Sequence, residues 1–201
     1  MTRRRDIALA GHTGDITAAR AALGDVDPSI RETAVGALHR LHALSDTELV
    51  ALMDPGHEPD ASVRRRAVEV AAQYPNVSPE HALRDPDWSV VEMACWTVGE
   101  HESANDTTLH RLIELAGSHS EPLVRESAVA ALGAVGDPRG LPAIVAATHD
   151  KPAVRRRAAV ALAPFDTPEA EDALRRLLDD RDWQTRQIAE DLLDERPGSL
   201  S

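Results

Sequence analysis

The sequence repeats itself along almost its whole length. Six twelve-residue segments align without gaps, and they begin at Ile30, Val63, Val90, Val124, Val154 and Thr185. The fifth position of every segment is alanine, and successive alanines lie 27 to 34 residues apart. Positions one, five, eight, nine and twelve are mostly apolar, and they fall within one stripe of an α-helix at about 100° per residue. Each segment is therefore predicted to be an amphipathic helix, and its small fifth residue would let a neighbouring helix approach closely.

A helix-start signal precedes most of these segments. The preceding turns supply good N-cap residues and prolines suited to the first helical position, namely Asp27, Asp60, Asp87, Asp182, Pro28, Pro122 and Pro152. Between the segments lie second apolar patterns, such as "SDTELVALMD" and "NDTTLHRLIELA". The chain is thus predicted to be all-α, with about six antiparallel helix pairs and no strand.

The pattern resembles the HEAT-like repeat of the phycobilin-lyase type. Its general form is Asp-Pro, then Val-Arg, Ala, Ala-Leu-Gly, Gly-Asp and an amphipathic helix, and "SEPLVRESAVAALGAVGDPRGLPAIVAATHD" at 120–150 matches it well. The resemblance implies an armadillo-like α-solenoid, a right-handed superhelix that fills one domain over residues 1–201. Its repeat helices would run from about 5 to 196, with a flexible tail at 197–201. Such a repeat is specific for a fold and says little about function.

The resemblance also implies a structural ladder of arginines. The second position of five segments is arginine: Arg31, Arg64, Arg125, Arg155 and Arg186. In such repeats these side chains reach acidic residues in the turns of adjacent units, here Asp25, Glu58, Asp150 and Asp180. The third segment has Val91 at this position, so we expect the ladder to be interrupted there.

The composition limits which class of partner and which cellular compartment we expect. The formal charge of −12 opposes generic attraction to nucleic acid or to an anionic membrane, because phosphate binding needs an excess of Lys and Arg. Cys95 is the only cysteine, so no disulfide and no thiolate metal cluster can form within one chain. We therefore expect a cytoplasmic protein whose partner is a protein with a basic surface.

The third segment, "VVEMACWTVGEH", departs from the others. Trp96 occupies its seventh position, roughly 145° from the centre of the apolar stripe, and Glu92 and Glu100 lie on the same outward arc. A tryptophan flanked by carboxylates has the profile of an interface anchor. We predict that Trp96, Glu92, Glu100 and Met93 bind a partner on the concave face of the solenoid.

A packing role is the alternative for the bulky residues of this region. The helix that precedes the third segment is squeezed into "SPEHALRD", and Met93, Cys95 or Trp88 could cover what a shortened helix leaves exposed. Trp183 shares the helix-start position of Trp88, and we expect it to pack against its turn. Packing is the stronger interpretation for Met93, Trp88 and Trp183, whereas Trp96 is equally compatible with both.

No motif in the sequence predicts catalysis, a cofactor or a metal site. His39 and His42 lie three residues apart, but the spacing implies no third ligand. The pairs His57-Glu58 and His101-Glu102 resemble those of di-iron hydroxylases built from similar repeats, yet they stand at a different place in the repeat. The leading hypothesis is a non-enzymatic scaffold or adaptor.

Two enzyme-like readings stay open on the same scaffold. Alkylpurine DNA glycosylases are also built from HEAT-like repeats, and the triplets at 64–66 and 155–157 supply arginines. Successive helical residues point about 100° apart, so we do not expect either triplet to form one patch. A tetrapyrrole-binding protein similar to the phycobilin lyases is the other alternative, and only family likeness supports it.

Overall fold

The structure, a computed structural model, describes residues 2–195, and over these residues every regular element is a helix. The predicted absence of strands is thereby confirmed for the described residues. The α-helices are α1 (Thr2–Thr13), α2 (Ile16–Ala21), α3 (Pro28–Arg40), α4 (Asp46–Met53), α5 (Ala61–Ala71), α6 (Trp88–His101), α7 (Asp106–Ser118), α8 (Pro122–Val135), α9 (Leu141–Ala147), α10 (Pro152–Ala161), α11 (Pro168–Leu177) and α12 (Trp183–Asp194). Three 3₁₀ helices complete the set: η1 (Ala22–Gly24), η2 (His81–Arg84) and η3 (Pro138–Gly140). The tail expected at 197–201 lies outside the described residues.

The helices group into two compact units, Met1–Thr97 and Val98–Ser201. The boundary between them falls within α6, which contributes its first ten residues to one unit and the rest to the other. The single-domain arrangement stays a prediction, and the two units are treated one at a time below.

Each repeat segment forms a helix, and we call these the repeat helices: α3, α5, α6, α8, α10 and α12. Their starts follow the expected chemistry, because Asp27, Asp60 and Asp182 each accept a hydrogen bond from a backbone N–H of the first turn. The fifth-position alanines are fully buried, at 0% exposure in all six helices. The invariant alanine therefore lies at close helix contacts, as its position in the apolar stripe indicates.

Helix α1 is a further repeat helix that the sequence pattern did not reveal. Its sequence "TRRRDIALAGHT" aligns with "VRRRAVEVAAQY" of α5, but the fifth position is Asp6 instead of alanine. It packs along α3 through Ile7 and Ala10, which are buried. Within residues 2–195 the structure thus has the six expected pairs of a repeat helix and a connecting helix, with one additional repeat helix; one of the connecting helices is only the 3₁₀ helix η2.

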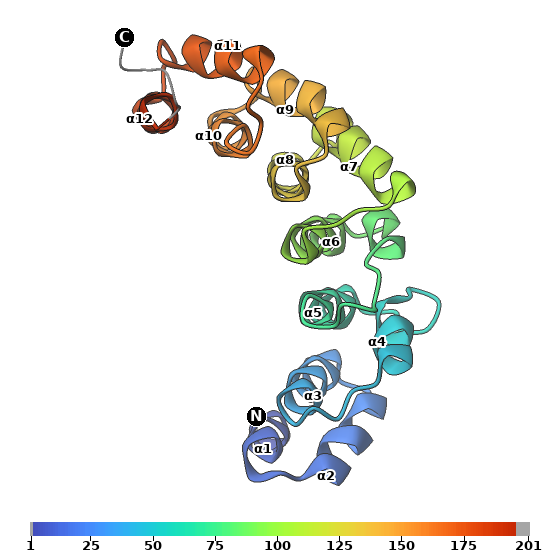
Figure 1. Cartoon of the computed structure of the whole chain (residues 1–201). Helices are drawn as coiled ribbons and strands as arrows, with labels where there is room; N and C mark the ends of the chain where they lie inside the picture. The colour runs from blue at the N-terminus through green and yellow to red at the C-terminus, as the bar shows by residue number, and fades with distance from the viewer. Residues whose placement is uncertain (1, 196–201) are drawn as a thin grey trace. The chain divides into compact units, whose positions relative to one another are not determined.

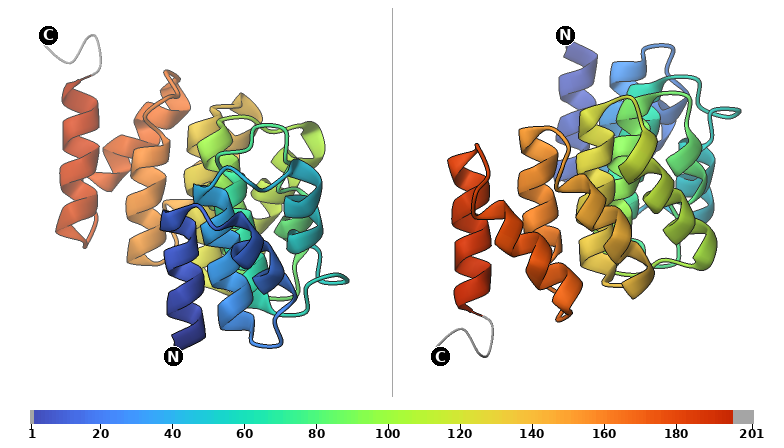
Figure 2. Two further views of the ribbon diagram at one scale, coloured as in Figure 1. Left: turned by 90° about the horizontal axis from the view of Figure 1, so that it is seen from below. Right: turned by 90° about the horizontal axis from the view of Figure 1, so that it is seen from above.

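Within each unit the repeat helices form one layer and the connecting helices another. In the first unit α3 lies between α1 and α5, while α2 packs on α3 and α4 on α5 (Figure 1). In the second unit α10 lies between α8 and α12, while α9 packs on α8 and α10 and α11 packs on α12. Figure 2 shows α10 and α12, in orange and red, side by side. Stacked helix pairs of this kind make an all-α solenoid fold.

Candidate functional site

Arg64, the second residue of its repeat segment, is a buried charged residue with 3% of its surface exposed. Its Nε and Nη2 donate to the two carboxylate oxygens of Asp85, at 2.8 and 2.9 Å. Its Nη1 donates to the carbonyl oxygens of Glu58 and Pro59, at 3.0 and 2.9 Å. The side chains of Arg64 and Asp85 are 4% and 0% exposed, so this fork-to-fork pair is removed from water.

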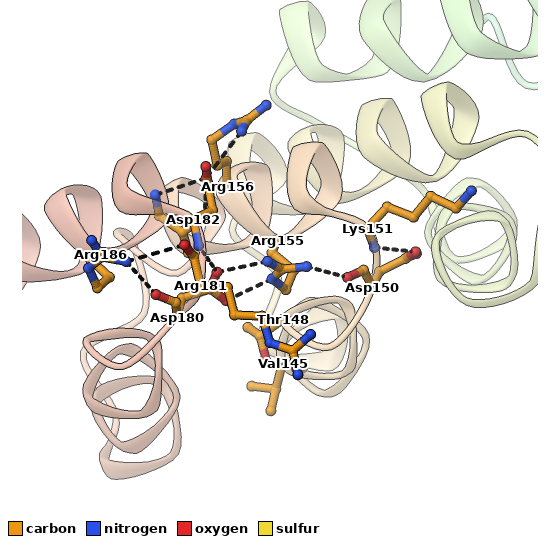
Figure 3. Close-up of polar contacts among 11 residues, drawn as sticks. Val145, Thr148, Asp150, Lys151, Arg155, Arg156, Asp180, Arg181, Asp182 and Arg186 are labelled. Atoms are coloured by element: carbon orange, nitrogen blue, oxygen red, sulfur yellow. Dashed lines mark hydrogen bonds and ion pairs between the residues drawn. The ribbon is translucent and has the colours of Figure 1, made fainter.

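The same geometry recurs at the other arginines of the ladder. Arg31 pairs with Glu58, Arg125 with Asp150 and Arg155 with Asp180, each through two hydrogen bonds of 2.6 to 2.8 Å. In each case Nη1 donates to a carbonyl oxygen of the turn before the arginine's own helix. Figure 3 shows Arg155 between the Asp150 carbonyl and the Asp180 carboxylate.

Every acid of the ladder also stabilises the start of its own repeat helix. Asp25, Glu58, Asp85 and Asp180 each accept a hydrogen bond from the backbone N–H two residues later, at 2.8 to 3.0 Å, and Asp150 accepts one from the next residue. One carboxylate thus holds both the arginine of the preceding repeat and the turn that precedes its own helix. This double use explains why an acid stands four or five residues before these repeat segments.

The ladder forms one run in each unit, and three of its pairings differ from the sequence expectation. Arg64 uses Asp85, which the sequence analysis did not name as an acceptor. The carboxylate of Asp25 lies 2.9 Å from Arg3 Nη2, because Arg3 is the second-position residue of the unrecognised repeat helix α1. Arg186 donates only to the carbonyl oxygens of Asp180 and Arg181, and within residues 2–195 no carboxylate accepts from it.

The turn before α8 lacks the acid. His119 stands there, and its Nδ1 accepts from the backbone N–H of Glu121 at 3.1 Å. The histidine therefore keeps the local role of the acid but brings no carboxylate. Val91 is likewise the one second-position residue among the six aligned segments that is not arginine.

Pairing shifts the pKa values of the ladder groups. Hydrogen bonds from Arg125 and Arg155 lower the pKa of Asp150 and of Asp180. Burial acts to raise the pKa of Glu58, but the hydrogen bonds from Arg31 and from the Asp60 N–H lower it below its usual value. Because these native pKa values lie below the unfolded ones, the pairs stabilise the fold near neutral pH, and the contribution is lost as the pH falls through the native pKa values.

The exposed face of α6 carries Trp96 and its two acidic neighbours. Trp96 is 40% exposed, Glu100 is exposed and Glu92 is half-buried. The Glu92 carboxylate lies 3.9 Å from Arg65 Nη2 of the adjacent helix α5. The opposite faces of α6 are closed, since Val90, Ala94 and Cys95 are 0% exposed and Thr97 Oγ1 donates to the Val68 carbonyl at 2.9 Å. Trp96 is thus an aromatic side chain on an otherwise well-anchored helix.

Met93 does not share this face. It is 8% exposed and belongs to the core, because the fourth position of the segment borders the apolar stripe, about 60° from position one. We therefore correct the expected set by leaving Met93 out of the exposed surface.

Exposure does not separate Trp96 from the tryptophans for which packing was expected. Trp88 is 43% exposed and Trp183 is 64% exposed. Both are the first residue of their helix, so they precede the apolar stripe that packs on the neighbouring helices. Of the three, Trp96 is the one in the middle of a helix.

The two arginine triplets do not form basic patches of their own. In the first, Arg64 is buried on Asp85, Arg65 lies 3.9 Å from Glu92, and Arg66 pairs with Glu69 at 2.8 Å. In the second, the three side chains reach Asp180, Asp182 and Glu126. Each triplet therefore spreads its charges over three directions, as the helical spacing predicts.

Residues 2–195 bring no three His, Cys, Asp or Glu side chains together in a way that could hold a metal ion. No helix among these residues combines the length and the apolar character that crossing a bilayer requires.

Comparison with known proteins agrees with the repeat geometry. The chain is similar to an engineered protein (TM-score 0.65, 20% identity, 90% of this chain and 97% of that one) and to a designed armadillo repeat protein (TM-score 0.60, 16% identity, 90% and 98%). It is also similar to the complex of CpcE and CpcF of phycocyanin lyase from Nostoc sp. PCC7120 (TM-score 0.62, 23% identity, 89% and 75%). At these identities the likeness concerns the fold alone.

No curated protein matches the sequence. A family model for HEAT repeats matches residues 79–153 and 141–193, more than half of the chain, and the protein therefore belongs to the HEAT-repeat family.

Proposed function

We propose that this protein is a non-enzymatic scaffold or adaptor that binds another protein through the exposed face of α6. The observation that carries the proposal is Trp96, a large aromatic side chain exposed in the middle of a helix and flanked by Glu92 and Glu100. Truncation of tryptophan anchors of this kind typically costs a protein interface more than 1 kcal/mol. That this face is the concave one stays a prediction.

The charges around Trp96 favour a basic partner. Glu100 is exposed, and the whole chain carries a formal charge of −12. A lysine or arginine of the partner could lie over the indole ring and pair with a neighbouring carboxylate, which combines a cation–π contact with a charge-assisted hydrogen bond. The long-range field would also speed association with a basic surface. A cytoplasmic location fits a chain with a single, buried cysteine and belongs to the same proposal.

The enzyme-like alternatives have weaker support. A glycosylase-like enzyme needs a basic face for DNA, whereas here the triplet arginines are distributed among carboxylates. The likeness to a phycocyanin lyase complex concerns the fold alone.

Affinity capture with matched tryptophan variants tests the proposal. Wild-type protein, Trp96→Ala and Trp183→Ala would be immobilised and exposed to native cell extract, and bound proteins identified by mass spectrometry. Trp183 is the control because it is more exposed than Trp96 and lies on a different helix. We expect a basic protein to be retained by wild type and Trp183→Ala. Its affinity for Trp96→Ala should fall by roughly 30-fold, the equivalent of about 2 kcal/mol.

Two results would contradict this function. Equal retention of all proteins by the three baits would show that Trp96 is not an anchor. Recovery of nucleic acid or of a pigment, instead of a protein, would favour one of the enzyme-like alternatives.

A further inference from the structure

Three arginines from three successive repeat helices converge on one pocket of the first unit. Arg4 of α1, Arg40 of α3 and Arg66 of α5 line a pocket of about 200 Å³ together with Ala8, Glu32, Thr33, Gly36 and Ala37. The three arginines are far apart in sequence, so the cluster exists only because α1, α3 and α5 pack in one layer. Sequence inspection finds the triplet at 64–66 but not this cluster.

Glycines make room for two of the guanidinium groups. A methyl group added at Gly36 would lie 2.9 Å from Arg66 Nη2. One added at Gly11 would lie 2.9 Å from Arg40 Nη1 and 2.9 Å from Ala37 Cα, so Gly11 also allows α1 and α3 to approach closely. Contacts this short do not occur between real side chains, so any larger residue would displace the arginines. The glycines thus allow the guanidinium groups to lie against the backbones of α1 and α3.

The arginines retain hydrogen-bond donors for a ligand. Arg4 Nε donates to Thr33 Oγ1 at 3.1 Å, and its Nη2 lies 4.0 Å from Glu32 Oε2. Arg66 Nη1 pairs with Glu69 at 2.8 Å. No hydrogen bond or ion pair engages the guanidinium of Arg40 within residues 2–195, and each guanidinium has five N–H donors. Most of the available donors are therefore uncommitted.

The corresponding place in the second unit shows that the repeat fold does not require this cluster. There, α8 and α10 form an open groove of about 560 Å³ lined by Ala130, Gly133, Ala134, Val160, Ala161, Ala163 and Pro164, with Arg157 as the one charged residue. An apolar lining serves equally well between two repeat helices. The arginines of the first unit thus need an explanation other than packing.

We infer that the pocket formed by Arg4, Arg40 and Arg66 binds a phosphate group. Guanidinium groups present planar pairs of donors that match the oxygens of a phosphate, and three of them outweigh the neighbouring Glu32 and Glu69. Burial, followed by the charges of Arg66, His42 and Arg40, lowers the pKa of the adjacent His39, in keeping with a positive local field. The inference is independent of the role proposed for Trp96.

The size of the pocket limits what can enter it. Sites for whole small molecules usually measure about 300–1,000 Å³, so a pocket of about 200 Å³ accommodates one phosphate group while the rest of the ligand stays outside. Free phosphate and a phosphorylated serine or threonine side chain share this chemistry. The net charge of −12 disfavours a nucleic acid strand with its continuous row of phosphates.

Isothermal titration with inorganic phosphate, at an ionic strength matched with sodium chloride, tests the inference. Wild type would be compared with Arg40→Gln and Arg66→Gln, and with Arg157→Gln as control. Arg157 occupies the same repeat position as Arg66, is exposed, and also has a glutamate nearby, Glu126 at 3.7 Å. We expect about millimolar binding by wild type and Arg157→Gln, and at least tenfold weaker binding by the two pocket variants.

Peptides distinguish the two sources of the phosphate group. A phosphoserine peptide that binds more tightly than both inorganic phosphate and its unphosphorylated form would identify a phosphorylated partner, whereas equal binding of peptide and phosphate would identify the free ion. Both outcomes support the site if they depend on Arg40 and Arg66. Absent phosphate binding in wild type would overturn the inference, as would an equal loss in Arg157→Gln. Preferential binding of a single-stranded oligonucleotide would overturn it as well. Circular dichroism of each variant excludes unfolding as the cause, and Trp96→Ala should bind phosphate normally.

Discussion

Replacing Arg64 by methionine should destabilise the protein far more than the same change at Arg186. Arg64→Met keeps the length of the side chain but leaves the Asp85 carboxylate, which is 0% exposed, without its two guanidinium hydrogen bonds. Removing one partner of a buried ion pair typically costs 3–5 kcal/mol. For a chain of this size a loss of 1 kcal/mol lowers the melting temperature by about 2–4 °C, so we expect a decrease of roughly 6–20 °C.

Arg186 is the matched control because it has the same repeat position and similar carbonyl contacts, but no carboxylate partner within residues 2–195. Arg186→Met should cost about 1 kcal/mol or less. The double variant Arg64→Met with Asp85→Asn should be more stable than Arg64→Met alone, because it removes the unpaired charge and keeps an acceptor for the Asp87 N–H. Urea denaturation followed by circular dichroism measures all four proteins. Equal destabilisation by the two methionine variants, or a double variant less stable than Arg64→Met, would refute the reasoning.

Two further predictions concern packing and charge. Gly133→Ala should destabilise by about 1–3 kcal/mol, since the added methyl group would lie 2.7 Å from Ala161 Cβ and 2.8 Å from Ala161 Cα. Gly117→Ala, where nothing lies within 4 Å, should instead stabilise by about 0.4–1 kcal/mol, and thermal melts that rank the pair the other way would contradict this. Arg139 lowers the pKa of Asp137 from 3.8 to about 2, so the pair acts above about pH 3.8 and is lost as the pH falls through 2. Arg139→Ala should return the Asp137 pKa toward 3.8, which carboxyl NMR titration can follow; a wild-type value near 3.8 would show that the pair does not form in solution.

The sequence predicts the repeat helices well because their signal is local. Alanine at the fifth position and an N-cap or proline at the start are properties of single segments, and the helices at 28–40 and 122–135 follow directly from them. The first repeat helix was missed for the same reason, since Asp6 replaces the diagnostic alanine. The outward position of Trp96 also follows from helical spacing alone.

Features that depend on two or three helices are not visible in a single segment. Asp85 was not named as the acceptor of Arg64, although it stands in the turn before its repeat helix as Glu58 and Asp180 do. Arg4, Arg40 and Arg66 come together from three different helices, and their spacing along the sequence follows no fixed period, so no sequence pattern reveals the cluster. Met93 was misplaced because a position at the edge of the apolar stripe can be covered or open, depending on its neighbours.

The ladder sets a rule for lengthening or shortening this protein by whole repeats. Each paired arginine of the ladder binds the acid in the turn that precedes the next repeat helix. A stretch of chain can therefore be duplicated only if the turn at its start carries a carboxylate for the arginine of the repeat before it. Duplicating residues 150–179 meets this condition, because the new Arg155 would find a second Asp150 and then Asp180. Duplicating 119–149 does not, because Arg125 would face a second His119. One histidine in a turn thus determines which parts of the chain are interchangeable.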